Sequence, residues 1–265
     1  LSKVEAQAGD DPLQVTVDVV DGFGNRVGNG EMVTLTVENC PTAVLQPTSA
    51  PTVDGRVSAS LAVGTTPCQG DVRAAAGARQ SAGVAFRVTP ADPQTLTVTA
   101  PPTLTASGVQ TGTVWISLRD RFLNGIDSVV TLQLAPELGS LAQTEVQTVN
   151  GTGRTTLTSP RALGSAVLSA QVGGLTASTT VQYVAGPPTY LSMVPNRPSL
   201  AADGVSSLPL TLNVVDAYGN PASGFVALAS NMGTSVSPPS GALENGLFLG
   251  TLSAGTVAGT ANLTA

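Results

Sequence analysis

Apolar and polar residues alternate along most of the chain, in short runs separated by Gly, Pro, Asn and Asp. One run places Val15, Val17 and Val19 on one side and polar residues on the other. A period of two residues is typical of a β-strand with one buried face and one solvent-exposed face. The turn residues between the runs keep these strands short. The pattern therefore predicts an all-β fold.

The same pattern occurs three times, with a period of 95 residues between the openings at Leu1, Leu96 and Leu191. Each copy contains an alternating strand that ends in an aspartate. The apolar positions of these strands are Val15, Val17 and Val19; Val114, Ile116 and Leu118; and Leu210, Leu212 and Val214. About seven short strands in each copy of about 95 residues predict a seven-stranded, Greek-key, Ig-like β-sandwich.

The period predicts three tandem domains, over residues 1–90, 91–186 and 187–265. Proline-containing linkers, residues 89–93 and 185–188, join them. Because proline stiffens a linker, we expect a semi-rigid rod of about 110–120 Å. The third copy stops inside its sixth strand, so we expect domain 3 to lack its last strand, G. This leaves two alternatives, a fragment of a longer array or a strand supplied by a neighbour.

Each alternating strand is followed by a turn with the pattern Asp-x-aromatic-x-Asn. Asp and Asn side chains commonly hydrogen-bond the backbone of a turn, and Asn and Gly tolerate positive φ. We therefore interpret these turns as structural, with the aromatic ring over the end of the core. Ca²⁺ binding is the alternative, and a domain junction could add Asp92 or Asp203 as ligands, although one carboxylate per turn is few for such a site. The turn residues are Asp21, Phe23 and Asn25; Asp120, Phe122 and Asn124; and Asp216, Tyr218 and Asn220.

Cys40 and Cys68, both in the first copy, are the only cysteines. In the predicted sandwich, strand C ends at the pole where strand E leads into strand F, and strands C and F are neighbours. Both cysteines therefore lie at one pole, and we predict a disulfide that stabilises domain 1 by roughly 3 kcal/mol. A disulfide indicates an oxidising compartment. The same pole faces domain 2, so we expect the cysteine loops to meet the turn of residues 120–124 there.

Trp115 is the only tryptophan, and its position in the alternating strand corresponds to Thr16 and Thr211. Those positions belong to the outward face, so the indole is expected to be exposed. A lone exposed aromatic residue is often without consequence, but tryptophan is also enriched at interaction hot spots. Trp115 is therefore a candidate interface residue.

Two phrases of the third copy, Ala201-Ala202-Asp203-Gly204 and Asp216-Ala217-Tyr218-Gly219-Asn220-Pro221, resemble bacterial Ig-like repeats of the invasin/intimin group. The first copy matches with Asp21-Gly22-Phe23-Gly24-Asn25, whereas the second departs with Leu123 in place of Gly. The resemblance extends over nearly the whole chain. It implies stalk domains of surface adhesins, which hold a tip domain away from the cell.

Composition and charge argue against several other classes of function. The chain has no His, which removes triads with an imidazole base and imidazole metal ligands. The formal net charge is −6, without a basic patch for nucleic-acid phosphates. No apolar stretch is long enough to span a membrane. The carboxylates are scattered, and Gly22-x-Gly24 lies between strands instead of before a helix, so neither an enzyme nor a cofactor is indicated.

The sequence thus favours a non-catalytic stalk or spacer in a large bacterial cell-surface or secreted adhesin-like protein, with the periplasm as an alternative location. Its partners would be neighbouring repeats or other proteins, and a host or cell-surface ligand would bind domains outside this segment. One alternative is a subunit of an extracellular filament, in which a neighbour donates the missing strand. Another is a protein- or glycan-binding module that uses Trp115 or the polar loops.

Overall fold

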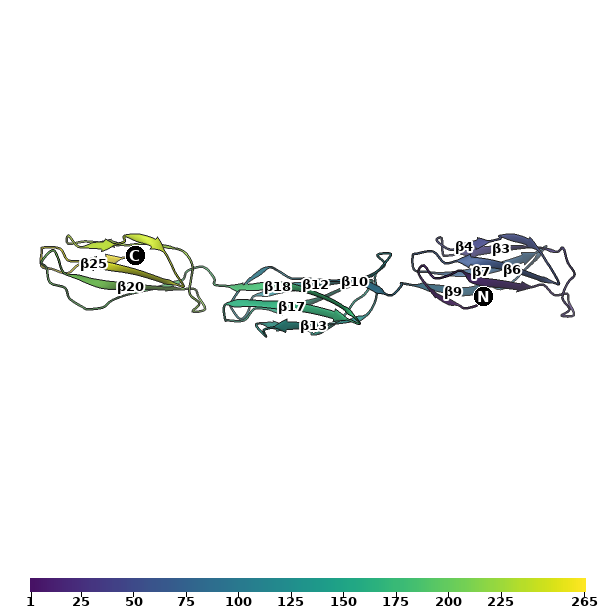
Figure 1. Ribbon diagram of the computed structural model, residues 1–265, viewed down its shortest axis with the longest axis horizontal. Coiled ribbons are helices and arrows are strands. Elements are labelled where there is room, and N and C mark those ends of the chain that lie inside the picture. The colour runs from purple at the N-terminus through teal and green to yellow at the C-terminus, as the bar shows by residue number, and fades with distance from the viewer.

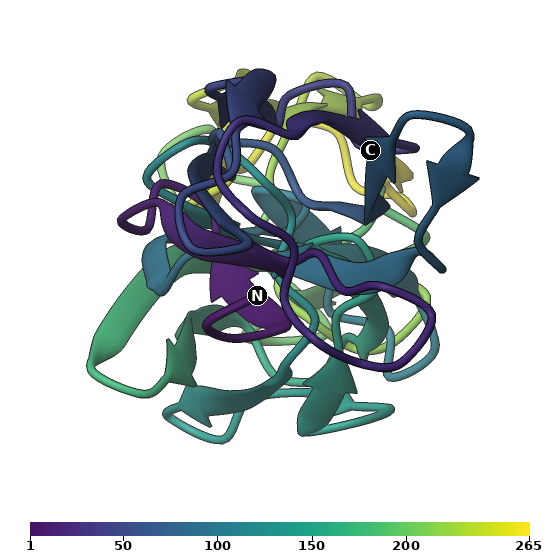
Figure 2. The same cartoon turned by 90° about the vertical axis from the view of Figure 1, so that its right-hand side faces the viewer.

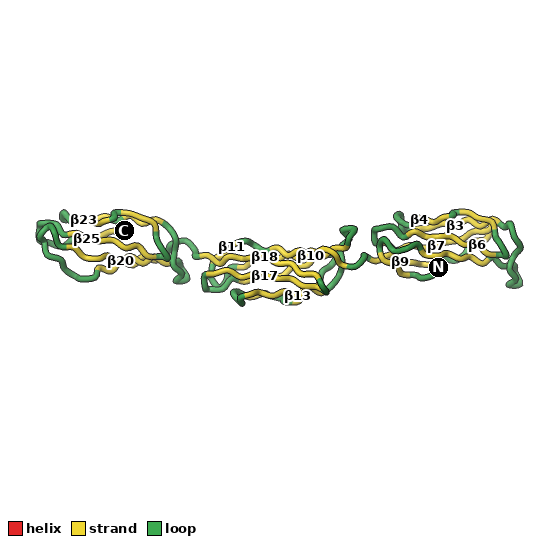
Figure 3. Tube along the Cα trace, in the orientation of Figure 1, coloured by secondary structure: helices red, strands yellow, loops and turns green.

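The computed structural model describes all 265 residues and contains 26 β-strands and no helix (Figure 3). Its sheets form three β-sandwiches over residues 5–89, 93–184 and 190–264, which we call domains 1, 2 and 3. The sandwiches follow one another in a row (Figure 1). With no helix present, none is available to cross a membrane.

Domain 1 packs the sheet β2-β6-β4 against the sheet β1-β9-β7-β3-β5, with the short strand β8 beside β7. Strand β3 pairs with β7, which gives the predicted C–F neighbours. The strands are β1 (Glu5–Gln7), β2 (Leu13–Asp18), β3 (Met32–Glu38), β4 (Val44–Gln46), β5 (Ser49–Pro51), β6 (Arg56–Ala62), β7 (Cys68–Ala76), β8 (Arg79–Gln80) and β9 (Val84–Thr89).

Domain 2 has the same plan, with the sheets β10-β12-β16-β14 and β11-β18-β17-β13-β15. Burial alternates along β12, so the apolar residues predicted to face inward do so. The strands are β10 (Pro93–Thr99), β11 (Thr103–Thr105), β12 (Thr111–Asp120), β13 (Val129–Ala135), β14 (Ser140–Leu141), β15 (Glu145–Gln147), β16 (Thr152–Thr158), β17 (Gly164–Val172) and β18 (Leu175–Val184).

Domain 3 forms the sheet β19-β20-β25-β23 and two small pairs, β21-β24 and β22-β26. It has no counterpart of β9 or β18. Its central apolar cluster holds 5 buried residues, against 17 in each of the other domains. The strands are β19 (Tyr190–Pro195), β20 (Ser207–Val215), β21 (Phe225–Ala227), β22 (Ala229–Ser230), β23 (Ser235–Ser237), β24 (Ser240–Ala242), β25 (Leu247–Ser253) and β26 (Leu263–Thr264).

Two details differ from the sequence prediction. Domains 1 and 2 each contain nine strands, because short edge strands accompany the seven expected ones.

The register of the first strand also differs, because Leu1 does not correspond to Leu96. The Ser2 N–H donates to the Gln14 carbonyl, whereas Leu96 pairs with Leu118, much nearer the aspartate turn. Leu1 therefore corresponds to Ala100, a shift that the apolar pattern did not resolve because Leu1 also packs against the core.

Successive domains are turned relative to one another. In Figure 1, β3 lies along the upper side of domain 1, whereas its counterpart β13 lies along the lower side of domain 2. Figure 2 looks along the row and shows the domains behind one another in different orientations. Each junction therefore sets a rotation as well as a distance.

Candidate functional site: the interdomain junctions

The aspartate turn of domain 2 is organised by the carboxylate of Asp120. Its Oδ1 accepts hydrogen bonds from the backbone N–H groups of Phe122 and Asn124, each at 2.8 Å. Its Oδ2 accepts one from Nδ2 of Asn124 at 2.7 Å. The Asp and Asn side chains therefore hold the turn backbone, as the sequence predicts.

The other two domains repeat these bonds. In domain 3, Asp216 Oδ1 accepts from the N–H groups of Tyr218 at 2.8 Å and Asn220 at 2.9 Å. In domain 1, the Asp21 Oδ1 accepts from Phe23 and Asn25, each at 2.9 Å. The motif thus builds one local structure at the N-terminal pole of every domain.

At the first junction, this turn also binds domain 1 and the linker. The Ala91 N–H donates to Asp120 Oδ2 at 2.9 Å, and Asn124 Nδ2 donates to the Thr65 carbonyl at 2.8 Å. Thr65 lies three residues before Cys68, so the predicted meeting with this turn is confirmed for the loop that leads to Cys68. We call this pair of interdomain hydrogen bonds the clasp.

The second junction has the same clasp. The Gly186 N–H donates to Asp216 Oδ2 at 2.8 Å, and Asn220 Nδ2 donates to the Ala106 carbonyl at 2.8 Å. In both junctions the aspartate binds the linker and the asparagine binds the body of the preceding domain. The linker and the preceding domain are therefore both tied to one turn.

The aromatic residues of the turns do not cover their own cores, so that prediction is wrong. Phe122 instead packs against the core of domain 1, and a Cβ on Gly9 would lie 2.5 Å from its ring. Tyr218 keeps 47% of its surface exposed and Phe23 keeps 94%. The turn lies at the pole, where the nearest apolar surface for its ring belongs to the adjoining domain.

The two clasped aspartates are buried, with 0% of Asp120 and 1% of Asp216 exposed. Burial raises the pKa of the Asp216 carboxyl, but the hydrogen bonds from Gly186, Asn220 and Tyr218 outweigh it and lower the pKa to about 2. Burial also raises the pKa of the Asp120 carboxyl. The hydrogen bonds from Asn124, Ala91 and Phe122 lower this pKa by more than burial raises it, so the net shift is downward. Both groups are therefore carboxylates at neutral pH.

Leu123 lies in the left-handed region, with φ of 68°, where Gly24 and Gly219 lie in the other turns at 87° and 85°. Its N–H still donates to the Asp120 carbonyl at 3.1 Å, so the turn keeps its shape despite the substitution. A non-glycine residue pays a steric cost of about 1–2 kcal/mol for this conformation. The departure from the repeat pattern is thus accommodated as backbone strain.

The predicted disulfide between Cys40 and Cys68 is present, with a Cα–Cα distance of 5.4 Å. It ties the loop after β3 to the start of β7. In domain 2, Gly164 starts β17 and pairs with Tyr183 as Cys68 pairs with Val88. The Tyr183 hydroxyl donates to the Leu138 carbonyl in the loop after β13, at 2.9 Å. A hydrogen bond thus joins the region that a covalent bond joins in domain 1.

Trp115 lies in the middle of the outward face of β12, as its position in the alternation predicts, with 48% of its surface exposed. Its partners across the sheet are Arg154 on β16 and Thr99 on β10. The indole is far from the clasps in the sheet register, so it does not belong to the junctions.

The carboxylates considered as Ca²⁺ ligands do not gather. Asp92 Oδ1 accepts from Gln7 Nε2 at 3.1 Å, and Asp203 Oδ1 accepts from the N–H groups of Val205 and Ser206. No group of three or more His, Cys, Asp or Glu side chains is arranged to hold a metal ion.

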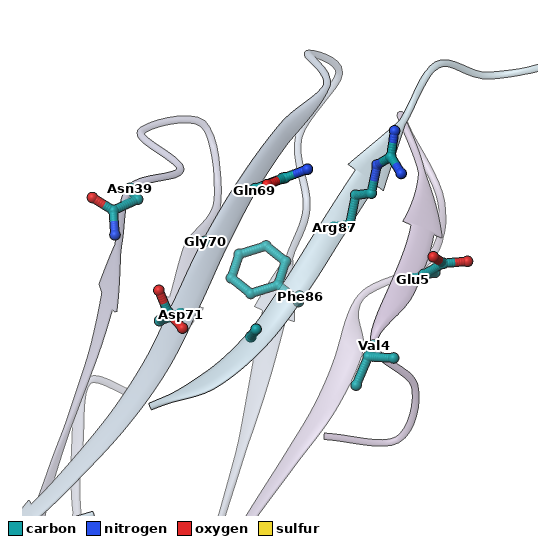
Figure 4. Close-up of a pocket in the computed structure, with 9 residues that line it drawn as sticks. Val4, Glu5, Asn39, Gln69, Gly70, Asp71, Phe86 and Arg87 are labelled. Carbon is teal, nitrogen blue, oxygen red and sulfur yellow. The ribbon is translucent and has the colours of Figure 1, made fainter. Parts of the chain in front are cut away.

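A hollow of about 560 Å³ lies over β7 and β9 of domain 1. Figure 4 shows Glu5 and Arg87 on one side of it and Asn39 and Asp71 on the other. It is open, and its lining residues include no Ser, Thr or Cys to serve as a nucleophile. The junctions, by contrast, bring hydrogen-bonded polar groups of two domains and a linker together.

The sequence located the turn residues of each clasp but missed their partners. Thr65 and Ala106 contribute backbone carbonyls, which carry no residue-type signal. Gly9 has φ of 78° and lies against the Phe122 ring, so glycine at this position was the one available sign of a close approach.

Residues 92–186 match the family model described as "Invasin, domain 3". A search among curated proteins found no match. Among solved structures, invasin, described as a bacterial integrin-binding protein, is 22% identical over 96% of this chain and 53% of that chain, with a TM-score of 0.61. This chain thus spans about half the length of the invasin structure.

Two other solved structures cover the chain at similar scores. The FdeC adhesin of Escherichia coli is 18% identical over 97% of this chain and 90% of that chain, with a TM-score of 0.59. InvD of Yersinia pseudotuberculosis is 17% identical over 98% of this chain and 79% of that chain, with a TM-score of 0.57. These findings confirm the predicted resemblance to the invasin/intimin-like array of bacterial Ig-like domains.

Proposed function

We propose that the chain is a non-catalytic stalk segment of a large, adhesin-like bacterial protein. The observation that carries this proposal is the repetition of one clasp, Asp to linker and Asn to domain body, at both junctions. A function that needs only separate domains would not require the same interdomain bonds twice. A function that depends on distance and orientation would.

The clasp supplies what a spacer needs. Each linker is tied at one residue to the following turn, which limits its freedom beyond what proline imposes. Each following turn is tied to the preceding domain, which limits bending and rotation. Loads then pass through the 127 backbone hydrogen bonds and the cores of the sandwiches.

The location and partners follow from the same proposal. The Cys40–Cys68 disulfide is the kind of bond that persists outside the cytoplasm, so we place the chain at the cell surface, in a secreted protein or in the periplasm. Similar adhesins, FdeC among them, support the surface. Its direct partners would be neighbouring repeats, and a host protein would be bound by other domains. Nucleic acid and membrane lipid are not expected partners of this acidic segment.

Small-angle X-ray scattering of the purified chain tests the proposal. We expect a single elongated form with a maximum dimension of about 110–120 Å. The double variant Asn124→Ala and Asn220→Ala removes both bonds to the preceding domains, and its distance distribution should broaden. Asn25→Ala removes the same side chain from the turn that holds no junction and serves as the matched control. A wild-type curve identical to that of the double variant would contradict the stalk.

A binding module is the second candidate, and the exposure of Trp115 beside Arg154 favours it. Titration of the chain with glycans and candidate surface proteins would then shift the Trp115 fluorescence. Trp115→Phe would abolish binding without changing the scattering curve. Unchanged fluorescence with every candidate would contradict a binding role for the Trp115 face and leave the stalk as the proposed function.

A further inference from the structure

The outward face of the sheet β10-β12-β16-β14 in domain 2 combines an aromatic ring, positive charge and hydroxyl groups. Trp115 lies in the middle of this face, directly opposite Arg154 on β16 and Thr99 on β10. Every other side chain that the strand register places here belongs to a threonine, a serine or Arg119. Thr113 on β12 is one of the exposed threonines beside the indole. We call this surface the Trp115 face.

The Trp115 face is positive although the chain is acidic. The formal net charge of the whole chain is −6, but the four strands of this sheet contain a single carboxylate, Asp120, which is buried in the first clasp. The chain has four ion pairs, and neither Arg119 nor Arg154 belongs to one. Cations without a carboxylate partner attract an anionic ligand to the surface that carries them.

The fold does not require the pair of Trp115 and Arg154, because the other domains build the same sheet without it. In domain 1, the outward Asp18 forms ion pairs with Arg26 and Arg56, each at 3.0 Å, so positive charge on that face is balanced. In domain 3, the strands of the corresponding sheet contain no charged residue. The pairs at the corresponding positions are Thr16–Ser58 in domain 1 and Thr211–Leu249 in domain 3.

We propose that the Trp115 face binds an acidic glycan, a polysaccharide whose sugars carry carboxylate groups. The half-exposed indole of Trp115 offers a flat apolar surface to the C–H groups of a pyranose ring. Residues directly opposite in an antiparallel pair have Cβ atoms about 4.5–5.5 Å apart. The Arg154 guanidinium therefore donates paired hydrogen bonds to a carboxylate of the stacked sugar or the next one. The threonine hydroxyls around them exchange hydrogen bonds with sugar hydroxyls.

The composition of the Trp115 face favours a glycan over a protein or a small anion. Trp115 is its only large apolar side chain, so the face lacks the apolar centre of a protein interface. A small anion would use Arg154 and leave the indole without a contact. From Thr111 to Arg119, β12 presents this face over roughly 26 Å, which accommodates several sugars in a row. The inference rests on the binding role proposed for Trp115 and is independent of the stalk.

The test is a titration of the full chain with oligomers of polygalacturonic acid. The matched control ligand is the fully methyl-esterified oligomer, which keeps the sugar rings and hydroxyls but has no charge. Because Trp115 is the only tryptophan, a saturable change in its fluorescence reports binding at this face. We expect the acid oligomer to bind at least about tenfold more tightly than the ester, since only the acid forms charge-assisted hydrogen bonds with Arg154.

Calorimetry of variants assigns the binding to the two central residues. Arg154→Gln should weaken binding of the acid oligomer about tenfold, because the paired hydrogen bonds to the carboxylate are lost. Arg79→Gln, which removes an exposed arginine from domain 1, makes the same change in net charge and should leave the affinity unchanged. Trp115→Thr introduces the residue found at the corresponding positions of the other domains and should abolish binding.

Three results would overturn the proposal. The first is the absence of binding by the acid oligomer, and the second is equal affinity for its methyl ester. The third is an equal loss in Arg154→Gln and Arg79→Gln, which would reduce the interaction to overall charge. A response of Trp115 to a protein but to neither oligomer would exclude the acidic glycan and keep the broader binding role. Scattering reports the stalk separately, and all three variants should retain the wild-type curve.

Discussion

Leu123 shows at the scale of one residue how the motif tolerates a change. The turn needs a left-handed conformation after its aromatic residue, and only domain 2 meets this need without glycine. The hydrogen bonds of Asp120 to the backbone on either side hold the turn closed around it. The strain is therefore stored locally and does not change the clasp.

We predict that Leu123→Gly stabilises domain 2 by about 0.5–1 kcal/mol. Relief of the left-handed strain exceeds the added entropy of glycine in the unfolded chain, and the exposed Leu123 side chain loses little burial. Denaturant unfolding measures the change. Leu123→Ala keeps the strained φ and should leave stability unchanged, and equal effects of the two substitutions would contradict the explanation.

The buried carboxylate of Asp216 makes the second junction sensitive to acid. Its folded-state pKa of about 2 lies below the unfolded value of 3.8. Its contribution to stability is thus complete above about pH 4 and is lost as the pH falls towards 2. We predict that the unfolding free energy of domain 3 declines through this range.

Asp203 contributes to the same decline, because hydrogen bonds from Ser206 lower the pKa of its carboxyl to about 2. Asp216→Asn removes one of the two carboxylates. Unfolding experiments between pH 2 and pH 7 should therefore give a shallower pH dependence in the variant. A dependence identical to that of the wild type would show that Asp216 is not responsible.

At the scale of elements, domains 1 and 2 hold the C-terminal pole together by different chemistry. The disulfide of domain 1 links the loop after β3 to β7, and the Tyr183 hydroxyl of domain 2 links β18 to the loop after β13. The strand registers around Cys68 and Gly164 correspond. Domains 1 and 2 thus each tie the loop after strand C to their last strands, one by a covalent bond and the other by a hydrogen bond.

We predict that Tyr183→Phe destabilises domain 2 by about 1–3 kcal/mol, because it removes the bond to the Leu138 carbonyl while keeping the buried ring. Denaturant unfolding followed by Trp115 fluorescence reports this domain alone. Tyr190→Phe, which removes a hydroxyl from an exposed side chain, is the control. A loss no larger than that of the control would mean that the bond contributes nothing.

At the scale of the whole molecule, the first junction depends on the close approach of the Phe122 ring to Gly9. A methyl group at Gly9 would lie 2.5 Å from that ring, so the ring has to move for any larger side chain to fit. Gly24 has a similar φ of 87° but has open space around it. The two glycines separate backbone strain from contact between domains.

We predict that Gly9→Ala and Gly24→Ala each cost domain 1 about 1–2 kcal/mol, since both place a side chain at positive φ. Only Gly9→Ala should also widen the distance distribution in small-angle scattering, because it displaces Phe122 from domain 1. Equal scattering curves for the two variants would show that the ring does not set the junction.

The repeat, the strands and the disulfide could be read from the sequence because each leaves a local or periodic trace. Alternation marks the buried face of β12, and the shared aspartate marks the end of each strand B. The register of Leu1 could not be read in this way, because a leucine and the alanine at position 100 both suit a position beside the core. Local patterns do not distinguish neighbouring sites of similar burial.

The sequence by itself thus determined three all-β modules, their order, the turn at each N-terminal pole and the cysteine pair. Only the tertiary structure decided what each turn touches. The partners of Asp120, Asn124, Asp216 and Asn220 are an N–H or a carbonyl of another domain, and every residue has such groups except for the N–H of proline. Their selection depends on where the chain folds, and that information lies in the packing of whole domains.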